Sequence, residues 1–491
     1  MKKINKESMV LFLIFLIVLS SRLYFAFQTP FFNDEAYFNY RLVHHISETG
    51  KPLNHDILSY NGREIVTSPV FHYILTFFGF FMPLDLALKL IPNIFISLSV
   101  FVVYRLSSVL VEEKNLSLLL ALLSGFVPVV FSETLNNISV YSLVLPLVFY
   151  LLYLFIKIRE KNNITKFAFF SFFLAILHPS SFIFLIALAF FVILMVSENI
   201  TIEKIKKEIL VFSLLLILFI QFLIYKKAFS VHGFEVIRNN VPVQVLATYF
   251  NFSFLETVLK IGILLIILGL ISIIFGWSKK REDVMILSSL ILSTLLLLWF
   301  KFLKDEIGLM FIGIALVVIS GISFAIFLKY LNKTKFSKYR TSITIFSVLI
   351  LICSLIIPSF LDASKNIQEH TPTEYEVLVL SWIKDNALPD VTILAPLDKG
   401  HLITALTGKR NVIDDNFLLA PDTSERFKDV YTIYSTKSEV RALDLIHKHN
   451  VDFILVPIES EIEFDNIRWL DDENCFEGIF FGTPKVYKVL C

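Results

Sequence analysis

The sequence predicts a polytopic α-helical membrane protein with about eleven transmembrane helices and a C-terminal extracytoplasmic α/β domain. Of its 491 residues, 56% are hydrophobic and only 18% are charged, which excludes an ordinary soluble enzyme and a disordered chain. Apolar stretches of about 20 residues, the length that crosses a bilayer as a helix, recur through residues 1–360. Residues 361–491 instead alternate short strands with helices. We therefore divide the chain into a membrane domain, 1–360, and a soluble domain, 361–491.

The predicted membrane helices follow the apolar stretches in order. They cover residues 8–28, 86–110, 115–132, 138–157, 163–178, 180–197, 208–225, 254–277, 284–301, 306–328 and 341–360. The apolar stretch from Pro69 to Met82 is too short to span the membrane, so we expect an interfacial or re-entrant helix there.

Lys and Arg in the short loops predict the orientation, because these residues resist translocation. With eleven spans and a cytoplasmic N-terminus, the basic clusters at 157–166, 204–207 and 279–281 all face the cytoplasm. Counting Pro69 to Met82 as a span would place most of these clusters outside. The chosen arrangement puts a first loop, 29–68, a second long loop, 226–253, and the tail, 361–491, on the outer side of the cell membrane.

The charge and the cysteine content limit the kinds of partner and of metal or disulfide site that the sequence predicts. The net charge of +1 gives no indication of a nucleic-acid partner, and the acidic tail carries 23 acids against 13 bases. Three cysteines provide neither a disulfide framework nor a thiolate zinc site. We expect Cys475 and Cys491 to be free thiols, with one disulfide between them as the alternative.

The first outer loop contains an acidic pair at the start of a predicted helix. Asn33 can cap a helix over residues 34–48, Asp34 and Glu35 occupy its first turn, and Gly50 closes it. One interpretation is that the two acids only favour the positive end of the helix dipole. The other is catalytic, because the pair lies within a few residues of the outer end of a membrane helix, where the headgroup of a lipid-linked substrate must lie.

A site that transfers a sugar from a lipid phosphate needs two kinds of group. A carboxylate has to take the proton of the acceptor, and a cation has to neutralise the departing phosphate. Asp34 and Glu35 can divide these roles, or hold Mg²⁺ or Mn²⁺ together through their oxygen atoms.

Residues 34–41, Asp-Glu-Ala-Tyr-Phe-Asn-Tyr-Arg, are followed by Tyr60-Asn61-Gly62-Arg63 and by Pro69 before an apolar helix. This arrangement resembles the C-type (GT-C) membrane glycosyltransferases, and most of all the catalytic subunit of oligosaccharyltransferase and the protein mannosyltransferases. The resemblance implies transfer of a sugar or oligosaccharide, with inversion, from a polyprenyl-phosphate or -pyrophosphate carrier to a protein, lipid or glycan acceptor. It places the catalytic acids on Asp34 and Glu35, and a metal-ligating carboxylate on Glu35.

Further candidate residues lie in the other outer segments. In the second outer loop, Glu133 falls where oligosaccharyltransferases have a second acidic metal-binding motif; the alternative is an acid that ends a helix at the interface. Arg41, His178 at a tight outer turn, and Lys301 near Lys304 at the end of another span are candidates to hold the lipid phosphate. The alternatives are a Pro-Ser turn that caps the next helix beside His178, and lysines that snorkel to the interface.

The tail carries the last group of candidates. We expect a small, partly parallel sheet with strands at 391–395, 411–413 and 451–456 and a hairpin near 478–490. The expected helices are one that contains residue 382, one over 401–407, and two near 423–435 and 437–449. The turn at 396–401 is similar in position to the oligosaccharyltransferase motif that reads the acceptor sequon. Asp398 and Gly400 match this motif, but both of its tryptophans and its tyrosine are absent. Asp398, Lys399 and His401 are the candidates for acceptor contact, against the alternative of a tight turn relaxed by Gly400.

A second class of function is a non-catalytic membrane protein that acts as a binding module or transporter on the same scaffold. Transporters usually contain interrupted helices and internal repeats. The chain has only 15 glycines in 491 residues and no visible repeat, which argues against transport.

Overall fold

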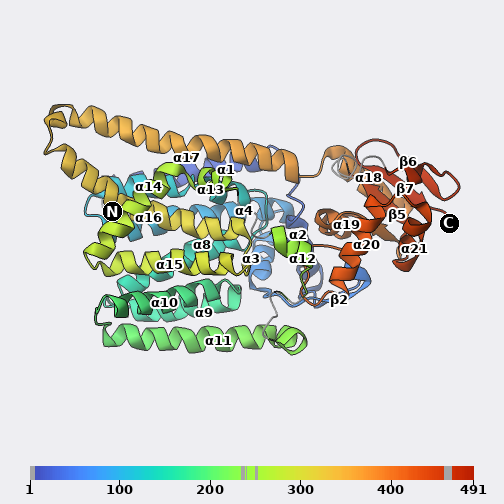
Figure 1. The fold of residues 1–491 in the computed structure, drawn as a ribbon, viewed down its shortest axis with the longest axis horizontal. Helices are drawn as coiled ribbons and strands as arrows, with labels where there is room; N and C mark the ends of the chain where they lie inside the picture. The colour runs from blue at the N-terminus through green and yellow to red at the C-terminus, as the bar shows by residue number, and fades with distance from the viewer. Residues whose placement is uncertain (1–5, 234–237, 239, 249–252, 458–466) are drawn as a thin grey trace.

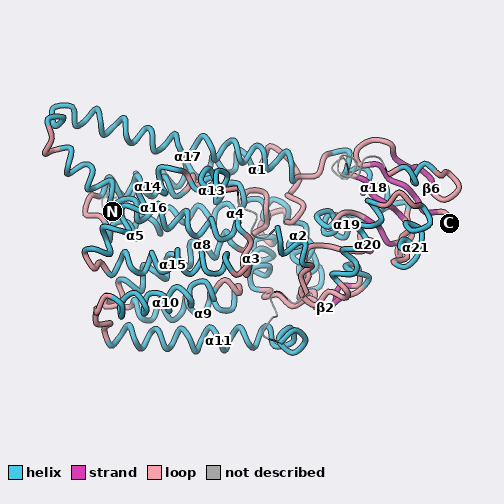
Figure 2. The backbone as a smooth tube through the Cα atoms, viewed as in Figure 1, coloured by secondary structure: helices cyan, strands magenta, loops and turns pink. Residues whose placement is uncertain are grey.

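The computed structural model describes residues 6–233, 238, 240–248, 253–457 and 467–491. Figure 1 shows the apolar helices side by side along the long axis of the molecule, with the C-terminal part beyond one end of them. The strands of the C-terminal sheet gather at that far end in Figure 2. The protein is thus a mostly helical polytopic membrane protein with a small C-terminal mixed sheet.

The helices of the apolar part lie where the hydrophobic stretches predict them. Among the described residues, six helical stretches are long and apolar enough to cross a membrane, and a seventh is the pair α13–α14, which bends by 83° at Gly262. Several predicted spans are shorter apolar helices or are interrupted. The observed helices are α1 (Lys6–Ala26), α3 (Val70–Gly79), α4 (Leu84–Ser97), α5 (Ser99–Leu110), α6 (Lys114–Ser124), α7 (Pro128–Glu133), α8 (Tyr141–Ile156), α9 (Asn163–Leu177), α10 (Ser181–Ser197), α11 (Lys204–His232), α12 (Val243–Thr248), α13 (Phe254–Ile261), α14 (Ile263–Ser278), α15 (Glu282–Trp299), α16 (Asp305–Leu331) and α17 (Arg340–His370).

Helix α16 is at the centre of the helical part. Of the 18 most apolar consecutive residues of α16, 89% are buried inside the protein. In the stretch that contains α17, the corresponding share is 17%. Helix α17 has 31 residues and is therefore about 45 Å long, longer than the roughly 30 Å hydrocarbon core. It continues through residue 360, where the division between domains is predicted, and that division stays a prediction.

Ion pairs join the loops at one end of the helices. Lys114 at the start of α6 lies 2.7 Å from Glu7, and Lys206 at the start of α11 lies 2.6 Å from Glu282 at the start of α15. Lys280, between α14 and α15, lies 3.6 Å from Glu198 at the end of α10. These loops therefore share one side of the protein, as alternating up and down helices require.

The tail folds into the predicted alternation of helices and strands. Its sheet has the order β4-β3-β5-β7-β6, with parallel pairs β3–β4 and β3–β5 and antiparallel pairs β5–β7 and β6–β7. All four residues of β5 are buried, as expected for the central strand of a sheet covered on both faces. The elements are α18 (Glu374–Asn386), β3 (Thr392–Leu394), α19 (Gly400–Thr407), β4 (Arg410–Asn411), α20 (Thr423–Ser435), α21 (Glu439–Lys448), β5 (Phe453–Val456), β6 (Phe476–Phe480) and β7 (Lys485–Val489).

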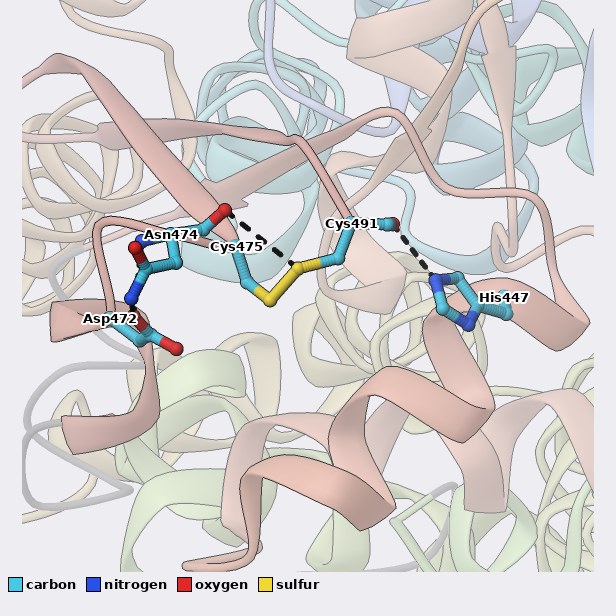
Figure 3. Close-up of a disulfide and its surroundings, with 5 residues drawn as sticks. All are labelled: His447, Asp472, Asn474, Cys475 and Cys491. Atoms are coloured by element: carbon cyan, nitrogen blue, oxygen red, sulfur yellow. Dashed lines mark hydrogen bonds between the residues drawn. A yellow bond between two sulfur atoms is a disulfide. The ribbon is translucent and has the colours of Figure 1, made fainter.

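A disulfide between Cys475 and Cys491 corrects the expectation of free thiols in the tail (Figure 3). The two Cα atoms lie 4.8 Å apart, because β6 and β7 pair and bring the chain end back beside the start of β6. Cys353 is the free, exposed cysteine of the described chain. The disulfide depends on the pairing of β6 with β7. The spacing of the cysteines in the sequence does not indicate this pairing.

The first long loop, residues 29–68, is inserted into the tail through its Tyr60-Asn61-Gly62-Arg63 segment. Tyr60, Asn61 and Gly62 all have positive φ, a tight turn in which glycine relieves strain at the third position. The phenol of Tyr60 donates to the backbone oxygen of Asp414 at 2.6 Å, and the guanidinium of Arg63 lies 3.2 Å from the Asp414 carboxylate. Arg63 and Asp414 are almost completely buried. This contact fixes the 414–416 turn against the loop.

We predict that Arg63→Met lowers the thermal stability of the protein strongly. The variant leaves Asp414 buried without the guanidinium beside it, and breaking a buried ion pair costs about 3–5 kcal/mol. Arg410→Met is the matched control, because the side chains of the Arg410–Asp390 pair are 37% and 86% exposed and such pairs contribute little. Melting temperatures of the purified variants in detergent test this; equal losses in both variants would contradict it.

Candidate functional site

A cavity of about 1220 Å³ lies where the first long loop, the helix ends and the tail meet. Its wall contains most of the residues predicted from the sequence: Asp34, Glu35, Glu133, His178, Asp398 and His401. Lys304 at the start of α16 and Asp415 in the tail line it as well. The loop, α3, the tail and the helix ends all contribute to its lining, and its volume is large enough for a headgroup-sized molecule.

The position of Asp34 is set by backbone contacts with distant segments. Asn33 donates from its backbone to Asn136 at 3.0 Å, and Asp34 donates from its backbone to His370 at the end of α17, at 2.9 Å. The side chain of Asn33 donates to Asn366 at 2.8 Å instead of capping the next helix, which begins only at Ala36. The predicted Asn33 cap is therefore wrong, because tertiary partners use that side chain. The predicted end of α2 (Ala36–Thr49) at a left-handed Gly50 is confirmed.

Asp34 is part of a buried cluster of three charges with Lys399 and Glu376. The ammonium group of Lys399 lies 2.9 Å from Asp34 Oδ2 and 3.3 Å from Glu376 Oε1, and all three side chains are buried. Burial raises the pKa of Asp34 to about 7, although Lys399 opposes this and Glu376 adds to it. Burial by itself lowers the pKa of Lys399, but the two carboxylates outweigh it and hold the pKa above its ordinary value. A carboxylate with a pKa near neutrality suits general base catalysis.

Glu35, next to Asp34, takes part in a different and more open network. Its Oε1 lies 3.0 Å from the ammonium group of Lys304, which lies 3.4 Å from Asp415 Oδ2. The Glu35 side chain is 59% exposed. The two adjacent acids therefore have different partners. Asp34 contacts Lys399, a buried lysine of the tail, and Glu35 contacts Lys304 in the cavity wall.

His401 and Asp415 extend this network into the tail. His401 Nε2 lies 2.8 Å from Asp415 Oδ1 and 3.7 Å from Asp414 Oδ1. Burial alone would lower the pKa of His401, but the two aspartates raise it. Burial alone would raise the pKa of Asp415, and Lys304 and His401 together hold it far below its ordinary range. The network is therefore a row of alternating charges along one wall of the cavity.

Gly400 allows the close contact that brings His401 to Asp415. Its φ of −59° is ordinary helix, so the tight-turn interpretation of this glycine is wrong. A Cβ atom here would lie 2.2 Å from the backbone oxygen of Ile413 and 2.7 Å from Asp414 Cβ. The glycine is required because α19 begins directly against the turn that follows β4.

The remaining predicted residues divide into those that line the cavity and those that do not. His178 lines it, with Nδ1 2.8 Å from the Ser180 hydroxyl. Arg41 is outside the lining and pairs with Asp56, whose pKa it lowers against the effect of burial. Lys301 is also outside the lining, in a turn where its φ is positive, and Lys304 occupies the wall in its place.

The sequence did not single out Asp415 and Glu376. Asp415 follows a short strand in Ile413-Asp414-Asp415-Asn416, and Glu376 lies in the first turn of α18, where acids are common in any helix. Only the packing of the tail on the first loop distinguishes them. The available signal was a pair of adjacent aspartates at the carboxyl end of a strand.

The residues described do not fit the Mg²⁺ or Mn²⁺ site implied for Glu35 and Glu133. These ions require several oxygen ligands around one point. Within the described ranges, three carboxylate, imidazole or thiolate donors come within 4.8 Å of one another at one place, Glu439, Asp472 and Cys475 in the tail. The Cys475 sulfur is in the disulfide and is no thiolate. Glu35 has an ammonium group beside it instead of further donors.

No protein-family model matches the sequence, and no curated protein sequence matches it. Solved structures do match. The apo crystal structure of the Archaeoglobus fulgidus oligosaccharyltransferase is similar over 97% of this chain and 73% of that chain, with a TM-score of 0.67 and 14% identity. ArnT from Cupriavidus metallidurans in the apo state is similar over 96% of this chain and 97% of that chain, with a TM-score of 0.58 and 8% identity.

A third match is the arabinofuranosyltransferase AftD from mycobacteria, which is similar over 97% of this chain and 40% of that chain, with a TM-score of 0.58 and 11% identity. Other structures of the first two proteins contain Zn and sulfate, a dolichol-phosphate with an inhibitory peptide, or undecaprenyl phosphate. At these identities the likeness establishes the architecture. The protein has the fold of the C-type membrane glycosyltransferases.

Proposed function

We propose that the protein is a membrane glycosyltransferase that moves a sugar or oligosaccharide from a polyprenyl-phosphate or -pyrophosphate carrier to an acceptor on the extracytoplasmic side. The observation that carries the proposal is the cavity at the helix ends, which presents a buried carboxylate, Asp34, and a lysine, Lys304, on its wall. The likeness to transferases whose structures contain dolichol-phosphate or undecaprenyl phosphate supports the same class of donor.

The proposed topology is eleven membrane spans with a cytoplasmic N-terminus in the cell membrane. It treats α4–α5, α6–α7 and α13–α14 as single, interrupted spans. The ion pairs among the loops of α1, α6, α10, α11, α14 and α15 support it, because they gather at one side the loops that this topology makes cytoplasmic. The cavity then opens at the outer side, beside the tail.

Asp34 is the proposed general base. Its carboxylate would accept the proton of the acceptor hydroxyl or amide while the acceptor attacks the anomeric carbon and the carrier phosphate departs. One displacement on the face opposite the phosphate gives inversion. Lys304 and His178 are the proposed contacts of the departing phosphate, and Asp398 and His401 are the proposed contacts of the acceptor, since all four line the cavity with Asp34.

We predict that Asp34→Asn lowers the transfer rate by about 100-fold to 10,000-fold, the contribution of a general base. The measurement is turnover of a panel of radiolabelled polyprenyl-linked sugars by the purified protein in nanodiscs. Glu48→Gln, an exposed acid in α2, the helix that follows Asp34, is the control and keeps the wild-type rate.

A wild-type rate in Asp34→Asn would overturn the role of this residue. If the wild-type protein binds these lipids but transfers no sugar from any of them, the non-catalytic alternative holds.

Lys399 has a structural role that an acceptor contact does not explain. We predict that Lys399→Met lowers the melting temperature in the absence of any acceptor, because Asp34 and Glu376 then face each other in a buried site; loss of one partner of a buried pair costs about 3–5 kcal/mol. Glu376→Gln in the same chain restores part of the stability. Lys384→Met, exposed on the same tail helix as Glu376, is the control. An unchanged melting temperature in Lys399→Met would contradict the prediction.

A further inference from the structure

Lys304 is held between two carboxylates of different accessibility. Its ammonium group lies 3.0 Å from Glu35 and 3.4 Å from Asp415, and its own side chain is 34% exposed toward the cavity. The two acids come from opposite sides, Glu35 from the first outer loop and Asp415 from the tail. The lysine is therefore the cation of a three-charge bridge across the cavity wall.

The wall around Lys304 is strongly acidic. Among the described residues, the cavity lining contains seven carboxyl groups and two lysines: Asp34, Glu35, Glu133, Asp305, Glu306, Asp398 and Asp415 against Lys260 and Lys304. A phosphate that enters such a cavity meets repulsion unless a cation stands beside it. Lys260 is already close to Glu256 and Glu306, at 3.4 and 3.8 Å. Lys304 is the lysine that stands beside Glu35, where the metal was expected.

We propose that the ammonium group of Lys304 takes the place of a divalent cation in this site, that Glu35 holds it there while the donor is absent, and that the donor phosphate replaces Glu35 on it. This inference rests on the proposed function, since it concerns the same donor. No covalent step is involved; one anionic partner of the lysine is exchanged for another.

The two acids differ in a way that makes Glu35 the partner that leaves. Its side chain is 59% exposed and can return to water at little cost, as exposed ion pairs are weak. Asp415 is 27% exposed, is bonded to His401 at 2.8 Å, and follows Asp414, which the first loop holds. The lysine thus stays attached to Asp415 when the phosphate arrives. The lowered pKa of Asp415 agrees with a carboxylate that keeps its cationic partners.

The proposal separates two roles of Glu35 that predict opposite results. As a metal ligand, Glu35 is required for binding of the phosphate. As a placeholder on Lys304, it competes with the phosphate, so its neutral variant binds the phosphate at least as tightly as the wild type. Lys304→Met removes the ammonium group under either role of Glu35. Its effect on binding therefore shows whether this lysine, and not another cation on the outer side, binds the phosphate.

The experiment measures binding of undecaprenyl phosphate by the full-length protein in nanodiscs, with EDTA or with added Mn²⁺. We expect equal affinity in both media for the wild type, a loss of about tenfold or more in Lys304→Met, and equal or higher affinity in Glu35→Gln; a charged hydrogen bond accounts for a factor of this size. Lys227→Met is the matched control, because Lys227 pairs with an outer-loop acid, Glu64, at 2.8 Å and is outside the cavity lining. It keeps wild-type affinity.

Loss of binding in EDTA that Mn²⁺ restores, or loss of binding in Glu35→Gln, overturns the inference and leaves the proposed function intact. Absence of binding by the wild type in both media overturns the inference and the proposed function together. If Lys304→Met does not fold, as its melting temperature would show, the EDTA and Glu35→Gln measurements still decide the question.

Discussion

The buried cluster of Asp34, Lys399 and Glu376 is the interaction on which the rest of the site depends. One lysine of the tail holds two carboxylates, one from the first long loop and one from the first tail helix. Removing charges from water is costly, and only close pairing offsets the cost. The cluster therefore forms only when the loop packs on the tail. It holds Asp34 in the wall of the cavity.

A second buried contact fixes the other half of the interface. Arg63 and Tyr60 of the loop hold the Asp414 turn, and the same turn carries Asp415 into the cavity. Gly400 allows α19 to start against this turn, which brings His401 within 2.8 Å of Asp415. Packing between loop and tail thus brings Asp415 and His401 together, and Lys304 at the start of α16 joins Asp415 to Glu35.

Adjacent acids in the loop have different environments for the same reason. Both line the cavity, but Asp34 is buried against Lys399 of the tail, whereas Glu35 stays largely exposed. A buried carboxylate with a raised pKa is suited to proton transfer, and an exposed one beside a lysine is suited to exchange with an anion. The two neighbouring acids therefore have separate partners in the fold, whereas the resemblance assigns a catalytic role to both and a metal to Glu35.

The sequence by itself determined the helices, the tail elements and the location of the acidic pair. These features depend on local properties: the length of apolar stretches, the alternation of strands and helices, and glycine at position 50. It also indicated the fold, through the segment from Asp34 to Arg41. The disulfide, the partners of Asp34 and Glu35, and the inclusion of Lys304 and Asp415 were decided only by the tertiary structure. Each of these requires residues from distant segments to meet, and which charges meet depends on how the tail packs on the loop, which no local pattern records.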